Sequence, residues 1–288
     1  MKPAAFDYCR PDTLDEALEL LHELGPDVSV LAGGMSLGPM LNTRLARPAA
    51  IVDIKRIPGL DEVSVGGGVR TGATLTQARA FEHETLMREV PLLALALPWV
   101  GHFQTRNRGT LCGSVAHADP SAETPLVLTT LDGEVELRST RRGTRRMRAR
   151  EFFVDVMTTA REQDELLTAL VWPARRPGTR YAFAEITQRH GDFAIVACAV
   201  ETVVDAQGRV ASLTMGLGGV ENRPVTVDTS EFIGERAGSA LALGVAAAAA
   251  RRVDPLIDCK ASPAYRRALV RSLGAQAIAE TFAAKPAT

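Results

Sequence analysis

The chain has 288 residues, of which 46% are hydrophobic and 23% are charged, and its formal net charge is −1. This composition is typical of a globular protein long enough to bury a large core, so it excludes extensive disorder. The near-zero net charge gives no overall attraction to nucleic acid or to an anionic membrane.

The first part of the chain alternates short strands and helices. A strand over 6–8 precedes a helix that Thr13 and Glu16 open as a capping box and that Gly25 ends. Further strands are expected at 28–31, 51–54, 63–65, 69–73, 134–138 and 166–172. Further helices are expected at 37–45, 76–83, 91–100 and 122–131. Residues 106–114 are polar, and we expect them to be irregular.

The second part begins after a linker over 175–178 that contains proline and glycine. Strand-like runs follow at 181–188, 193–204 and 210–217, and helices at 239–252 and 263–282. This order predicts an α+β fold with an N-terminal domain over 1–175. A smaller C-terminal domain over 178–288 is expected to have a three-stranded antiparallel sheet and helices.

The cysteines and the apolar segments favour a cytoplasmic location. The four cysteines are Cys9, Cys112, Cys198 and Cys259. None forms a C-x-x-C pair, so we expect reduced thiols and no metal or iron–sulfur site in this chain. The first ten residues lack an apolar leader, and the longest apolar stretch, 237–250, is shorter than the roughly 20 residues of a membrane helix.

A glycine-containing turn over 31–37, with the sequence LAGGMSL, lies between an expected strand and an expected helix. Gly33 and Gly34 allow backbone amides to converge, and the start of the helix adds partial positive charge, so the turn suits a phosphate. Ser36 is placed either to cap the helix or to bond a phosphate oxygen. The pattern is neither G-x-G-x-x-G nor a P-loop, so an ordinary tight turn is the alternative interpretation.

A second short turn over 110–114, with the sequence TLCGS, follows the basic residues Arg106 and Arg108. Taken alone it is compatible with an ordinary loop. A pyrophosphate, however, needs two sets of donors that face each other, and two such turns would supply them.

The two turns and the motifs around them resemble the FAD-binding medium subunits of molybdenum-containing hydroxylases. This family includes subunits of carbon monoxide dehydrogenase and of bacterial N-heterocycle dehydrogenases, and xanthine dehydrogenase carries a similar domain. The resemblance covers almost the whole chain. It is carried by LAGGMSL at 31–37, RL at 44–45 with Pro48, VDI at 52–54, RNRGT at 106–110, HADP at 117–120 and GDFA at 191–194.

The resemblance implies a two-part FAD-binding domain of the vanillyl-alcohol-oxidase-like (PCMH) type, followed by the smaller domain. It also implies FAD contacts for fifteen residues in all. These are Leu31, Ala32, Gly33, Gly34, Met35, Ser36, Leu37, Thr110, Cys112, Gly113, Ser114, His117, Asp119, Leu167 and Phe193. Because the isoalloxazine performs the redox chemistry, no side chain is assigned a catalytic role.

The resemblance also implies individual roles. The two turns hold the pyrophosphate, Asp119 accepts hydrogen bonds from the ribityl or ribose hydroxyls, and Leu167 packs on the adenine. Phe193 lies near the flavin where relatives often carry Tyr, so any role of that hydroxyl is lost here. His117 flanks the second turn, where a structural role is the alternative to a contact with flavin.

Three residues depart from the pattern of many or some relatives. Cys112 replaces a glycine, Ser114 an asparagine and Met35 a histidine. Because the backbone supplies most donors in such turns, we expect FAD binding to survive these changes.

The resemblance further implies a complex of three chain types, arranged as a dimer of heterotrimers. A large subunit would carry the molybdenum cofactor and a small subunit two two-iron clusters, so both groups are expected only in partner chains. This chain would pass electrons through FAD to an external acceptor, which is NAD, a quinone, oxygen or a carrier protein.

Two other functions remain open from the residues. A free-standing FAD-dependent oxidoreductase would need its own substrate pocket in the second domain. A nucleotide- or nucleic-acid-binding module would rest on the seven arginines between Arg138 and Arg150. Gly143 favours a hairpin with a solvated tip there, and no aromatic residues interleave the arginines, so we expect no nucleic-acid partner.

Overall fold

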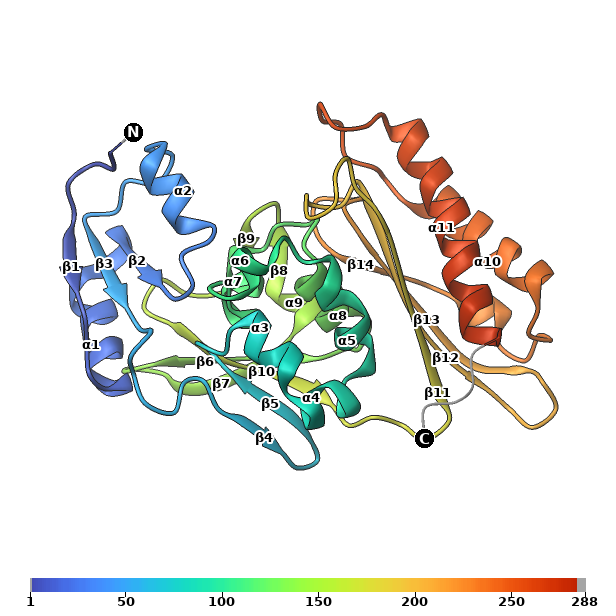
Figure 1. Ribbon diagram of the computed structural model, residues 1–288, viewed down its shortest axis with the longest axis horizontal. Helices are drawn as coiled ribbons and strands as arrows, with labels where there is room; N and C mark the ends of the chain where they lie inside the picture. The colour runs from blue at the N-terminus through green and yellow to red at the C-terminus, as the bar shows by residue number, and fades with distance from the viewer. Residues whose placement is uncertain (1, 284–288) are drawn as a thin grey trace.

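A computed structural model describes residues 2–283. The chain begins with a small parallel sheet, drawn in blue at the left of Figure 1. Its strand order is β1 (Asp7–Cys9), β3 (Ala50–Asp53) and β2 (Val28–Leu31). Helix α1 (Leu14–Leu24) covers this sheet, and α2 (Leu37–Asn42) follows β2.

The start and the end of α1 confirm the sequence prediction. The Thr13 hydroxyl accepts a hydrogen bond from the Glu16 amide at 3.2 Å, and Gly25 ends the helix with φ of +69°. The Glu16 carboxylate accepts from the Asp12 amide at 2.8 Å rather than from Thr13, so the reciprocal bond forms one residue earlier than in a standard capping box. Helix α2 ends before residue 45 because Arg44 has a left-handed backbone, with φ of +59°.

The N-terminal region, residues 2–173, also contains a five-stranded sheet. Its order is β4 (Val63–Val65), β5 (Gly68–Gly72), β10 (Leu166–Pro173), β6 (Glu134–Ser139) and β7 (Gly143–Arg148), and all neighbours are antiparallel. Short helices lie beside it: α3 (Gln77–Glu82), α4 (Glu84–Glu89), α5 (Pro91–Ala96), α6 (Phe103–Arg106), α7 (Leu111–His117), α8 (Glu123–Thr130) and α9 (Ala149–Phe152). A two-stranded ribbon pairs β8 (Phe153–Asp155) with β9 (Thr158–Thr159).

The expectation that 106–114 is irregular was wrong for its second half, which is the first turn of α7. Helices α4 and α9 and the β8–β9 ribbon were also not anticipated. Each is too short to show a helical or strand period, and α7 has only seven residues. The tertiary structure, rather than local periodicity, holds these elements in place.

The C-terminal region, residues 179–283, contains four antiparallel strands, which corrects the prediction of three. They are β11 (Thr179–Ile186), β12 (Val196–Val204), β13 (Val210–Gly218) and β14 (Val225–Val227), in that order. Strand β14 was missed because it has three residues. Helices α10 (Ser239–Arg252) and α11 (Pro263–Ala283) cover one face of this sheet (Figure 1).

Helix α8 joins the two regions. All eight of its residues are buried, and it contacts strands β12, β13 and β14. A side chain at Gly216 of β13 would overlap the hydroxyl of Thr130 on α8, so the backbone of β13 lies directly against side chains of α8. The sheet face opposite α10 and α11 therefore packs against the N-terminal region, and Phe183, Ala197 and Ala199 belong to that region's apolar core. Across residues 2–283, no helix combines the length and apolar character needed to cross a bilayer.

Candidate functional site

A cavity of about 520 Å³ lies where β2, the α7–α8 segment and the C-terminal region meet. Its volume is within the range of about 300–1,000 Å³ that is usual for cofactor sites. The lining includes every predicted contact residue except Asp119. These are residues 31–37, Thr110, Cys112, Gly113, Ser114, His117, Leu167 and Phe193. The fold thus brings together segments that are far apart in the sequence.

The first turn requires glycine at two positions for different reasons. Gly34 has φ of +73°, a conformation that other residues adopt only with strain. A side chain on Gly33 would overlap the carbonyl oxygen of Arg108 and lie 2.8 Å from the Cα of Gly109. The backbone of the first turn therefore rests directly on the chain that leads into the second turn.

The amides of the first turn are available to a ligand. Those of Gly33, Gly34, Met35 and Ser36 have no hydrogen-bond partner within residues 2–283. The Ser36 hydroxyl makes no capping bond to α2, and the Gly38 amide at the start of this helix donates to the Gly34 carbonyl at 2.9 Å. The hydroxyl is therefore also left to donate or accept.

The second turn is the start of α7, and most of its amides are already engaged. The Thr110 hydroxyl accepts from the Gly113 amide at 2.9 Å, and the Thr110 carbonyl accepts from Ser114 at 3.1 Å. The Leu111 amide donates to Leu75 at 3.2 Å. The second turn thus offers mainly the positive end of a helix, and the first turn offers most of the free amides.

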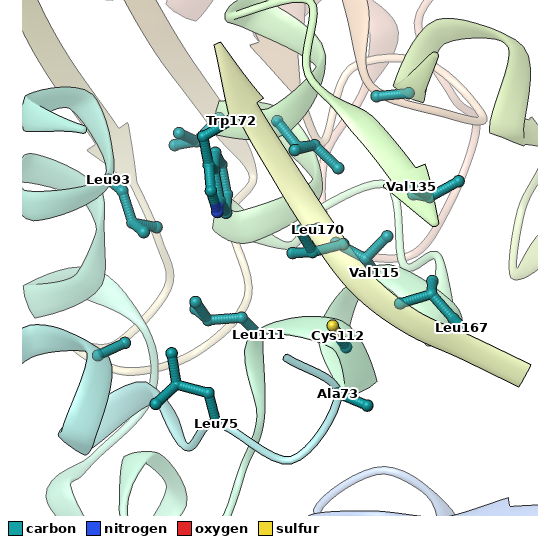
Figure 2. Close-up of a cluster of buried hydrophobic side chains, with 14 of the residues drawn as sticks. Ala73, Leu75, Leu93, Leu111, Cys112, Val115, Val135, Leu167, Leu170 and Trp172 are labelled. Carbon is teal, nitrogen blue, oxygen red and sulfur yellow. The ribbon is translucent and has the colours of Figure 1, made fainter. Parts of the chain in front are cut away.

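Cys112 contributes backbone, not its thiol, to the cavity. Figure 2 shows its sulfur inside a cluster of apolar side chains that includes Leu111, Val115 and Leu170. The Sγ lies 3.8 Å from the Thr71 carbonyl oxygen, and burial raises the pKa of the thiol. Cys112 is 3% exposed and belongs to the apolar core, so its side chain does not occupy the turn.

The two ends of the cavity differ in exposure. Leu167 is buried and belongs to the apolar cluster of Figure 2. Phe193 is 45% exposed, and the ammonium of Lys260 lies 5.8 Å from the centre of its ring. His117 is half-buried in the last turn of α7. The Phe193 end of the cavity is therefore the more exposed of the two.

Asp119 does not line the cavity. Its carboxylate accepts a hydrogen bond from the Ser121 amide at 2.8 Å and so stabilises the turn that precedes α8. Two buried carboxyls do line the cavity, that of Glu165 and that of Glu123, in the first turn of α8. Burial raises the pKa of Glu123 to about 7, and the charge of Asp119 adds to this effect.

The polar lining residues that sequence reasoning missed include Glu123, Gln77 and Arg161. The Gln77 Oε1 atom is buried and has no hydrogen-bond partner within the described chain. The Arg161 guanidinium donates to the carbonyls of Glu162 at 3.0 Å and Glu165 at 2.7 Å. None of the three belongs to a recognisable motif, so no sequence signal identified them.

Six of the seven arginines between 138 and 150 lie on a β6–β7 hairpin, as predicted, and Arg150 lies in α9 directly after it. Gly143 follows the tip of the hairpin with φ of +67°. Most of these arginines form ion pairs with acids of the same region. The pairs are Arg138–Asp15, Arg142–Asp164, Arg145–Glu165, Arg146–Glu136, Arg148–Asp132 and Arg150–Asp132. The nucleic-acid interpretation receives no support from a face whose charges are largely compensated.

The residues that are present fit a dinucleotide cofactor. A pair of turns in backbone contact, free amides in the first and a helix start in the second match a pyrophosphate. The unpartnered Gln77 oxygen and the buried Glu123 carboxyl supply acceptors for hydroxyl groups.

Comparison with known proteins gives matches over almost the whole chain. Residues 4–175 match the family described as "FAD binding domain in molybdopterin dehydrogenase", and residues 181–281 match "CO dehydrogenase flavoprotein C-terminal domain". The chain is 34% identical to subunit alpha of the 6-hydroxypseudooxynicotine dehydrogenase complex of Paenarthrobacter nicotinovorans, over 98% of this chain and 96% of that subunit.

A further relative and two solved structures are also similar to this chain. The carbon monoxide dehydrogenase medium chain of Afipia carboxidovorans is 34% identical, with 78% of each chain covered. Among solved structures, carbon monoxide dehydrogenase from Hydrogenophaga pseudoflava has a TM-score of 0.93 at 30% identity, covering 98% of this chain and 99% of that one. Quinoline 2-oxidoreductase from Pseudomonas putida 86 has the same TM-score and coverage at 32% identity.

Proposed function

Because the chain belongs to the family of FAD-binding medium subunits of molybdenum hydroxylases, we propose that it holds FAD in this cavity and transfers electrons through it. The observation that carries this proposal is the contact between Gly33 and the Arg108–Gly109 backbone. That contact fixes the two turns side by side in one cavity, as a pyrophosphate site requires.

Different residues of the chain bind different parts of the cofactor. The free amides from Gly33 to Ser36 donate to phosphate oxygens, and the start of α7 adds positive potential. Glu123 accepts from sugar or ribityl hydroxyls, the role that the family resemblance implied for Asp119. Leu167 forms an apolar wall for the adenine, and Phe193 offers a ring surface near the exposed end.

When it is bound, FAD supplies the redox chemistry, because it accepts electrons singly or in pairs. The protein holds and shields the cofactor. We infer that electrons arrive from the two-iron clusters of a small partner subunit and leave to an external acceptor. A large subunit with the molybdenum cofactor would complete the complex, as a dimer of heterotrimers. The relatives' names, "medium chain" and "subunit alpha", support membership of such an assembly.

The proposal is tested by the visible spectrum of the purified chain and by identification of the chromophore released on heating. Flavin bands with about one FAD per chain are the expected result. Gly33→Ala should lower the flavin content at least about tenfold, because the new Cβ separates the two turns. Gly66→Ala, in the β4–β5 hairpin, is the matched control, because a side chain there meets no atom within 4 Å.

Circular dichroism of both variants separates loss of the site from loss of the fold. A folded wild-type chain that stays colourless with added FAD, alone and after co-expression with candidate partner subunits, would refute the proposal. A chain that retains FAD and oxidises a substrate without partners would instead establish the free-standing oxidoreductase.

A further inference from the structure

A second cavity, of about 500 Å³, lies at the junction of the N-terminal and C-terminal regions. Its walls come from the start of α5, the end of α8, the segment after the β6–β7 hairpin, the inter-region linker and strands β11 to β14. It shares no lining residue with the first cavity. A molecule bound here would therefore contact both regions of the chain without touching the proposed FAD site.

Arginine dominates the charged lining, through Arg148, Arg150, Arg175 and Arg176. The first two share a single carboxylate, that of Asp132, which Arg150 reaches at 3.2 Å. One carboxylate compensates only one of the two guanidinium charges. Because each guanidinium carries five N–H donors in a planar fork, both retain donors beyond that shared bond.

The two remaining acids of the lining, Glu89 and Glu201, each pair with an arginine. The buried carboxylate of Glu201 pairs with Arg176, whose side chain remains largely exposed. The carboxylate of Glu89 pairs at 3.1 Å with Arg88, which does not line the cavity. The lining thus holds four arginines against three acids, one of which, Glu89, pairs outside the cavity, although the whole chain has a net charge of −1.

Neutral donors complete the lining. Thr129 is 3% exposed, and its hydroxyl has no hydrogen-bond partner within residues 2–283. Burial is the largest cause that raises the pKa of Tyr181 to about 12, so its phenol remains protonated and able to donate. A buried hydroxyl without a partner is rare and points to a partner that comes from outside the chain.

We propose that this second cavity binds a compact polyanion, a small molecule with at least two phosphate or carboxylate groups. Guanidinium forks match the planar oxygen pairs of such groups and form charge-assisted bonds with them. Bound there, the anion would tie the hairpin arginines to the linker that connects the two regions. The proposal does not depend on the identity of the cofactor in the first cavity.

The test is isothermal titration calorimetry of the full chain with two probes, inorganic pyrophosphate and citrate, in the presence of excess FAD to occupy the first cavity. We expect saturable binding of at least one probe. Tighter binding of pyrophosphate would identify a phosphate ligand, and tighter binding of citrate a carboxylate ligand. The absence of saturable binding of both probes would overturn the proposal.

Variants locate the binding. The double variant Arg148→Gln/Arg150→Gln should weaken it at least about tenfold, because it removes two guanidinium forks. The control is Arg141→Gln, an exposed residue of the same hairpin that does not line the cavity. Equal losses in the control and the double variant, or binding that survives in the double variant, would place the anion elsewhere and overturn the proposal.

Thr129→Val provides a second variant that removes no charge and keeps the side-chain shape. It should weaken probe binding by roughly threefold, since one hydroxyl donor is lost. Its thermal midpoint without the probe should not fall, because the hydroxyl has no partner in the chain to lose. An unchanged affinity would show that the anion does not reach this cavity.

Discussion

The buried carboxyl of Glu185 should make the protein less stable as pH rises. Glu185 lies on β11 and is 5% exposed, and neither of its oxygens has a hydrogen-bond partner within residues 2–283. Burial raises its pKa from 4.5 to about 9, and the nearby charge of Glu123 adds to the effect. The perturbation is Glu185→Gln, which keeps the shape of the neutral acid and removes the ionisation.

The magnitude follows from the two pKa values. Between about pH 4.5 and 9 the folded state holds a proton on Glu185 that the unfolded state has released. Stability therefore falls by about 1.4 kcal/mol for each pH unit in this window. At about pH 7.5, three units above the unfolded pKa, the cost is about 4 kcal/mol. Glu185→Gln should remove most of it, so the variant is the more stable protein at neutral pH.

The assay is urea unfolding of wild type and variant at several values from about pH 5 to 8, without added FAD so that ligand binding does not contribute. The difference in unfolding free energy should be small at the acidic end and grow with pH. Glu151→Gln, the same change at an exposed glutamate, is the control and should have little effect. A difference between wild type and Glu185→Gln that does not change with pH would refute the reasoning.

Three further predictions concern packing. Iodoacetamide should modify the exposed Cys259 and spare Cys112, whose thiol pKa is raised by burial; mass spectrometry that finds Cys112 alkylated in the folded protein would contradict this. Trp172→Phe removes the 3.1 Å hydrogen bond from the indole to the Thr71 hydroxyl. It should lower the free energy of unfolding in urea by about 1–3 kcal/mol. An unchanged free energy of unfolding would show that the bond contributes nothing. Gly216→Ala should destabilise by about 1–3 kcal/mol in the same assay, because its Cβ would overlap a buried hydroxyl of α8; unchanged stability would mean that α8 shifts freely.

The comparison of sequence and structure shows which signals are local. Helix α1 was predictable because its cap at Thr13, its apolar stripe and the glycine that ends it are all local in the sequence. The α7 helix was missed because seven residues give no period, and Thr110 looks like any loop threonine until its hydroxyl is seen to accept from Gly113. Strand β14 was missed for a similar reason, because its three residues form a strand only by pairing with β13.

In the site, too, some features were predictable from the sequence and others depend on the tertiary structure. The sequence alone predicted the first turn, because two adjacent glycines between an expected strand and an expected helix indicate a tight turn, and the motif order indicated the family. Only the tertiary structure decided that Gly33 touches Arg108 and Gly109, that Glu123 rather than Asp119 lines the cavity, and that the Cys112 thiol faces the core. The conformation of a turn depends on residues that are neighbours in the sequence, whereas the direction of a side chain depends on packing between segments that meet only after folding.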